Sequence, residues 1–130
     1  MKLSLCAEHA LLLLIHLTRQ GDRGSSKIQA MAISQGISTE SLKKILEVLT
    51  TAKYIDKEKD GYHLAQRAGK ISVAEIIRLF DGALAPHEPI SEKGYDGAPI
   101  EKEEKLSALF ASIQDQISNR LEKTMIADLA

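Results

Sequence analysis

The chain has 130 residues with a single cysteine, Cys6, no tryptophan and only 4% aromatic residues. One cysteine excludes an intramolecular disulfide and is usual in a reducing compartment. The apolar run at residues 10–17 is too short to span a bilayer, and no small-residue cleavage site follows it. We therefore expect a cytoplasmic protein of one domain, or one domain with an appendage, built on an aliphatic core.

Recognisable catalytic motifs are also missing. The sequence contains no glycine-rich phosphate loop, no nucleophile elbow and no spacing typical of a serine–histidine–acid site. The four histidines are scattered, and His16, inside the apolar run, is expected to be a core residue with a hydrogen-bond partner. We predict that the protein is not an enzyme and holds no cofactor.

The net charge of −1 hides an uneven distribution. Residues 1–70 contain 11 Lys and Arg against 7 Asp and Glu, a net +4, whereas residues 71–130 contain 6 against 11, a net −5. A basic amino-terminal half joined to an acidic carboxyl-terminal half suits a DNA-contacting module that carries a second functional part.

The chain is organised around residues 27–64. Apolar residues at helical spacing predict one helix over 27–35 and a second from 39 to about 53. Gly36 is placed to end the first helix and Ser38 to cap the second, while Asp60-Gly61 is a strong hairpin signal between two short strands. Helix, tight turn, helix and hairpin predict a mainly α fold, a winged helix-turn-helix, whose commonest use is DNA binding.

Two helices flank this unit. Residues 3–19 are apolar nearly all round, which predicts a helix buried on several sides, partly against a partner subunit. Ser25 or Ser26 is expected to cap the helix over 27–35. After the hairpin, Ser72 and Glu75 form a capping-box pattern that opens a helix over 73–80.

The carboxyl-terminal part differs in character. Residues 83–100 lose all periodicity and contain all three prolines, so we expect an irregular loop that serves as a sensor element. The expected division is therefore a DNA-binding domain at 1–82, this loop at 83–100 and a dimerisation helix at 101–130. The alternative is that this helix folds back on its own domain. We favour the dimer, because a palindromic DNA site requires two copies of the protein. The predicted dimerisation stripe is Leu106, Leu109, Phe110, Ile113, Ile117 and Leu121, continuing to Met125.

Five collinear segments resemble the Rrf-type family of bacterial winged-helix regulators, which includes the relatives IscR, NsrR and CymR. The resemblance implies a homodimeric DNA-binding transcription regulator, most simply a repressor of a pseudo-palindromic operator, with a small-molecule effector as a further partner. The segments are Met1-Lys2-Leu3-Ser4, residues 37–46 (ISTESLKKIL), residues 61–65 (GYHLA), residues 71–78 (ISVAEIIR) with Asp81-Gly82, and residues 123–129 (KTMIADL).

Two departures from the family pattern matter. Many members hold an iron–sulfur cluster on three cysteines in the loop before the long helix, but residues 83–100 contain no cysteine. Glu8 matches the position of an acidic cluster ligand in some relatives, yet it lacks the cysteine co-ligands. We therefore predict no cluster. The wing is also short and lacks the family's glycine-rich turn with an arginine, so Lys57 and Lys59 would substitute for it.

The DNA contacts expected from this pattern lie on three segments. On the second helix, Lys43 and Lys44 would touch phosphates or guanine edges, while the first turn lies nearest the bases. The alternative is an ordinary solvated helix face. The full predicted set is Ser26, Lys27, Ser38, Thr39, Glu40, Ser41, Lys43, Lys44, Lys57 and Lys59.

A metal or ligand site is a weaker hypothesis. Cys6, Glu8 and His9 fall within one helical turn, and His87 lies in the irregular loop, but no repeated metal-binding spacing accompanies them. Cys6 at an apolar helix position is more often a core residue. A different functional class also stays open, a winged helix that binds proteins and has no DNA affinity, for which the near-neutral charge and short wing are the motivation.

Overall fold

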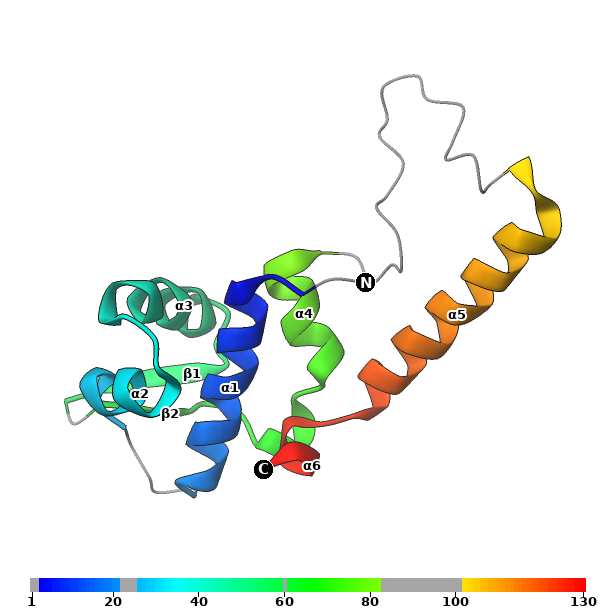
Figure 1. Cartoon of the computed structure of the whole chain (residues 1–130). Helices are drawn as coiled ribbons and strands as arrows, with labels where there is room; N and C mark the ends of the chain where they lie inside the picture. The colour runs from blue at the N-terminus through cyan, green and yellow to red at the C-terminus, as the bar shows by residue number, and fades with distance from the viewer. Residues whose placement is uncertain (1–2, 22–25, 60, 83–101) are drawn as a thin grey trace.

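The computed structural model describes residues 3–21, 26–59, 61–82 and 102–130. It confirms the predicted fold class, with helices and a two-stranded antiparallel wing (Figure 1). In chain order the elements are α1 (Leu5–Arg19), α2 (Ile28–Gln35), α3 (Thr39–Thr51), β1 (Ile55–Glu58), β2 (Gly61–Leu64), η1 (Ala68–Lys70), α4 (Val73–Asp81), α5 (Glu104–Lys123) and α6 (Ile126–Leu129).

Helix α1 is the centre of the fold. It lies between the part formed by α2, α3 and the wing and the part formed by α4 (Figure 1). Only one broad face of α1 is buried within the chain, because Leu5 and Leu12 on the other side are 66% and 46% exposed. The expected burial on several sides is therefore limited to this face, whose buried residues are Ala7, Ala10, Leu13, Leu14 and Leu17.

The helix-turn-helix forms as its local signals predict. Gly36 ends α2 in the left-handed conformation, with φ of 65°, which glycine adopts without a Cβ clash. Ser38 caps α3 by accepting a hydrogen bond from the Ser41 amide at 3.2 Å. Helix α3 ends at Thr51, two residues earlier than expected, because Lys53 has a left-handed φ of 66° that leads into the wing. The apolar face of α3 packs into the core through Leu42, Ile45, Leu46 and Leu49.

The wing is held against the start of α2. Strands β1 and β2 pair with Lys57 opposite Tyr62. Tyr62 also exchanges two backbone hydrogen bonds with Ser26, each 2.9 Å long. Gly61 makes this approach feasible, because its φ is 134° and an added Cβ would lie 2.6 Å from the Ser26 carbonyl carbon. The register of the hairpin is thus tied to the residue that precedes α2.

The carboxyl-terminal part leaves the core and returns to it. The capping box at Ser72 and Glu75 opens α4 as predicted. Helix α5 spans 20 residues, about 30 Å, and contains no buried residue; Figure 1 shows it running away from the other helices. It ends at Lys123, so Met125 lies outside it, contrary to the predicted stripe. The chain then re-enters the core at Ile126, which is fully buried.

The predicted loop at residues 83–100, with His87, lies outside the described residues, as does Asp60 of the hairpin turn. No helix in the described part of the chain is long and apolar enough to cross a membrane.

Candidate nucleic-acid interface

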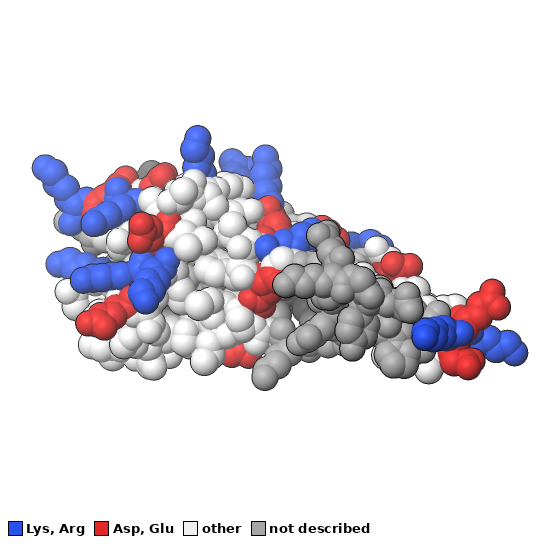
Figure 2. Space-filling view, turned by 90° about the horizontal axis from the view of Figure 1, so that it is seen from above, with Lys and Arg blue, Asp and Glu red and all other residues white. Residues whose placement is uncertain are grey.

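A shallow cleft brings together α2, α3 and the wing. Four lysines line it, Lys27 from the start of α2, Lys43 from α3, and Lys57 and Lys59 from the wing. Figure 2 shows Lys and Arg side chains projecting from the end of the molecule that carries these elements, with acidic groups among them. The remaining lining residues are Ile28, Gln29, Glu58, Gly61 and Tyr62. Cationic groups from three elements converging on one cleft are a suitable surface for a phosphate backbone.

Helix α3 presents the other predicted contacts. Lys43 and Lys44 are exposed, on the side opposite the buried stripe of the helix. Thr39, Glu40 and Ser41 form its exposed first turn. Ser38 is exposed but is engaged in the helix cap, because its hydroxyl donates to the Ser41 hydroxyl at 3.0 Å. A helix of this kind, with its first turn free, has the form of a recognition helix.

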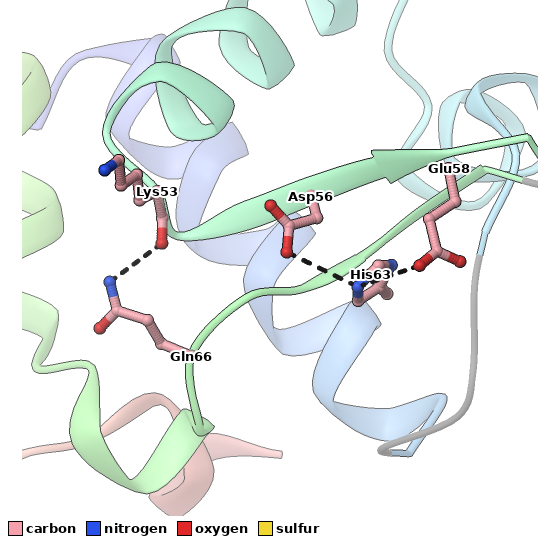
Figure 3. Close-up of polar contacts among 5 residues, drawn as sticks. All are labelled: Lys53, Asp56, Glu58, His63 and Gln66. Atoms are coloured by element: carbon pink, nitrogen blue, oxygen red, sulfur yellow. Dashed lines mark hydrogen bonds and ion pairs between the residues drawn. The ribbon is translucent and has the colours of Figure 1, made fainter.

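The wing has two chemically different faces. Asp56 and Glu58 lie on one face with His63, whose Nε2 is 3.8 Å from a carboxylate oxygen of each (Figure 3). Lys57 points to the opposite face because strand residues alternate, and there it shares the cleft with Tyr62. Glu58, which lies between the two wing lysines in the sequence, is thus near His63 and also lines the cleft. At the base of the wing, the Gln66 side chain donates to the Lys53 carbonyl at 3.0 Å (Figure 3).

Five residues of the cleft were outside the predicted set: Gln29 and Tyr62, together with Ile28, Glu58 and Gly61. Strand alternation would have found Tyr62, since it pairs with Lys57 across the hairpin and must share its face. No comparable signal marks Gln29, which joins the cleft only because the wing is fastened to the start of α2.

Ser26 does not have its predicted place. It is 6% exposed, and its hydroxyl lies 3.1 Å from Nε2 of His16. The N-cap of α2 is Lys27, which makes no side-chain capping bond, so the prediction that Ser25 or Ser26 caps this helix is wrong. His16 is half-buried and has Ser26 as its partner. The serine hydroxyl is buried beside this imidazole, whereas Lys27 lines the cleft.

Three residues of the hypothetical metal site, Cys6, Glu8 and His9, are described by the structure. Cys6 is exposed, which corrects the expectation of a core cysteine, and Glu8 is exposed while His9 is half-buried. Among the described residues no group of three or more His, Cys, Asp or Glu is placed to hold a metal ion.

The predicted dimerisation stripe lies along one side of α5. Leu106 and Leu109 are 42% and 53% exposed. The others, Phe110, Ile113, Ile117 and Leu121, are half-buried. At the carboxyl end, Arg78 of α4 forms an ion pair with Glu122. Among the described residues, helix α5 therefore presents an apolar side that is incompletely covered.

Comparison with known proteins identifies the family. Residues 3–130 match the model of the Rrf2 family, described as an iron-dependent transcriptional regulator. The chain belongs to the Rrf2 family. An HTH-type transcriptional regulator of Mycobacterium tuberculosis H37Rv is 30% identical over 135 residues, covering 100% of this chain and 81% of that protein. CymR of Bacillus subtilis is 26% identical over 133 residues, covering 100% and 90%.

Solved structures of the family share the fold. The structure of B. subtilis CymR, described as a global cysteine regulator, superposes with a TM-score of 0.82 at 24% identity, covering 100% of this chain and 96% of that one. Oxidised CymR from Staphylococcus aureus gives 0.81 at 26% identity, covering 100% and 96%. IscR from T. potens gives 0.74 at 20% identity, covering 99% and 85%. This Rrf2 member is therefore a winged-helix regulator of the DNA-binding type.

The family description names iron, and the residues of this chain do not fit a cysteine-ligated cluster. Such clusters are anchored by several thiolates, whereas the whole sequence has one cysteine. That thiol lies on the exposed side of α1.

Proposed function

We propose that this Rrf2 member is a cytoplasmic, non-enzymatic repressor that binds a pseudo-palindromic operator as a homodimer and works without an iron–sulfur cluster. The observation that carries the proposal is the convergence of Lys27, Lys43 and Lys57 in one cleft beside the exposed first turn of α3. Helix α3 would enter the major groove, with the wing and the start of α2 on the flanking phosphates.

The dimer is supported by the composition of α5. Its apolar stripe is incompletely covered within the chain, and a helix of this length gains most of its stability from packing. A second copy offers the same stripe, which makes a two-fold contact self-complementary. Two reading surfaces related by such an axis match an inverted repeat in DNA, and a dimer seated there would obstruct transcription.

The test is a pull-down of genomic DNA fragments with the purified protein at low and moderate salt. Enrichment of an inverted repeat is expected. On that DNA, the Lys43→Ala/Lys44→Ala double variant should bind about one to two orders of magnitude more weakly, with a salt slope shallower by about two. The matched control is Lys102→Ala/Lys105→Ala, which removes the same charge from an exposed region remote from the cleft.

Equal binding by the α3 variant and the wild type would overturn the assignment of the recognition helix. No enrichment of DNA at low salt would favour the protein-binding module instead. Stoichiometric iron in the same purified sample would contradict the proposal that no cluster is held.

A further inference from the structure

Among the described residues, one side-chain hydrogen bond joins α4 to the part of the molecule formed by α2, α3 and the wing. We call residues 26–64, which comprise α2, α3 and the wing, the reading head. The Tyr54 hydroxyl of the reading head donates to Oε2 of Glu75 in α4 at 2.9 Å. In the described part of the chain no other side-chain hydrogen bond joins the reading head to α4. Figure 1 shows α1 lying between them.

Tyr54 occupies the joint between α3 and the wing. Its amide donates to the carbonyl of Leu49 in α3, and its own carbonyl accepts from the Ala65 amide after β2, both at 2.9 Å. A movement of Tyr54 therefore moves α3 and the wing together. Burial, with the hydrogen bond and charge of Glu75, raises the pKa of Tyr54 to about 12, so the hydroxyl keeps the proton that it donates.

Glu75 lies where α5 is attached. Its other carboxylate oxygen accepts from the Ser72 amide at 2.6 Å. The adjoining Val73 amide donates to the carbonyl of Thr124, the residue that follows α5, at 2.9 Å. One turn further along α4, Arg78 pairs with Glu122. The Glu75 carboxylate is thus connected on one side to the reading head and on the other to the carboxyl end of α5.

We propose that the Tyr54–Glu75 hydrogen bond is a strut, a contact that holds the reading head at a fixed place relative to α5. Tyr54 and Glu75 are then positioning residues that determine which spacing of operator half-sites a dimer accepts. The consequence for DNA rests on the proposed function. Two recognition helices in a dimer must meet the major groove about one helical turn apart. A strut that holds each α3 at a fixed place relative to α5 restricts the spacings that both can reach.

The first experiment measures the strut without DNA. In a Cys6→Ser background, spin labels at Glu47→Cys on α3 and Asp115→Cys on α5 report the intrachain distance by pulsed electron resonance. Both positions are exposed. Labelled chains are diluted with unlabelled protein, so that distances between subunits do not contribute. Tyr54→Phe, which removes one hydroxyl, should broaden or shift the distance distribution.

Tyr62→Phe is the matched control for this measurement. It removes a hydroxyl from the wing that makes no hydrogen bond within the described residues, and it should leave the distribution unchanged. A Tyr54→Phe distribution that coincides with that of the parent would overturn the strut.

The second experiment measures binding to operators whose half-sites are moved together or apart by one base pair. The parent should prefer one spacing, and Tyr54→Phe should reduce that preference about fivefold, the scale of one lost hydrogen bond. A purely structural role would weaken binding at every spacing equally and would contradict the proposal. If the parent binds no DNA, the proposed function fails, while a broadened distance distribution would still support the strut.

Discussion

The reading head and α5 are stabilised in different ways. In the reading head, α3 has a serine cap at Ser38, α2 stops at a left-handed Gly36, and the buried face of α3 contributes four residues to the core. Helix α5 has no side-chain hydrogen bond at its N-cap, Glu103, and no buried residue. The reading head therefore buries the apolar face of α3 within one chain, whereas α5 leaves apolar side chains exposed among the described residues.

This difference predicts how each part responds to amino-acid substitutions. A substitution in the reading head should reduce the free energy of unfolding of the single chain. A substitution at Leu106 or Leu109, the exposed members of the apolar stripe of α5, should act mainly on association, because these side chains contribute little to packing among the described residues.

The largest effect is expected from Leu109→Glu. In the proposed dimer two apolar side chains would be replaced by carboxylates, at a cost of about 3 kcal/mol or more, so the dissociation constant should rise by about two orders of magnitude or more. Sedimentation equilibrium measures this change. Ala108→Glu is the control, because Ala108 is exposed on the opposite side of the helix.

If the two α5 variants associate equally well, the stripe is not the dimer interface. The thermal unfolding of the reading head should be similar in both, and a large loss in Leu109→Glu alone would mean that α5 folds back on its own domain.

Gly61→Ala should have the next largest effect. The new Cβ would enter the backbone of Ser26, and φ of 134° is unfavourable for alanine. We expect a loss of about 3 kcal/mol in the free energy of unfolding, measured by urea denaturation. In Gly69→Ala the added Cβ has no heavy atom within 4 Å, so this variant should be close to the wild type. Similar losses for both would show that the wing is not fastened through Ser26.

A smaller effect is expected from Ser38→Ala. Removing the cap of α3 should cost about 1 kcal/mol and increase amide hydrogen exchange in the first turn of the helix. Ser34→Ala is the control, since Ser34 is exposed and makes no side-chain hydrogen bond among the described residues. A loss no greater than that of Ser34→Ala would mean that packing alone determines where α3 begins.

The sequence predicted the features that depend on neighbours along the chain. The helix-ending role of Gly36 and the capping role of Ser38 depend only on residues within one helical turn. The capping box of Ser72 and Glu75 depends only on their spacing in the sequence. The apolar face of α3 follows in the same way from its periodicity. These elements identify a winged helix-turn-helix before any tertiary contact is known.

The errors concern residues whose environment is set by distant segments. Ser26 is buried because β2 pairs with it and His16 of α1 covers its hydroxyl. Cys6 is exposed because it falls outside the one face of α1 that the chain buries. Met125 leaves the stripe because the backbone there pairs with Ser72. The contact of Tyr54 with Glu75 likewise spans 21 residues and has no signature in either local sequence.

The two faces of the wing give the hairpin register a consequence for charge. With Gly61 beside Ser26, Lys57 shares a face with Tyr62, and Asp56 and Glu58 share the other with His63. A slip of one residue in a strand exchanges its faces. In β1 such a slip would turn Asp56 to the face of Tyr62 and turn Lys57 away from it, so the wing would offer less positive charge to the cleft. Because Gly61 has no side chain, the hairpin keeps the register in which Lys57 contributes positive charge to the surface that DNA would contact.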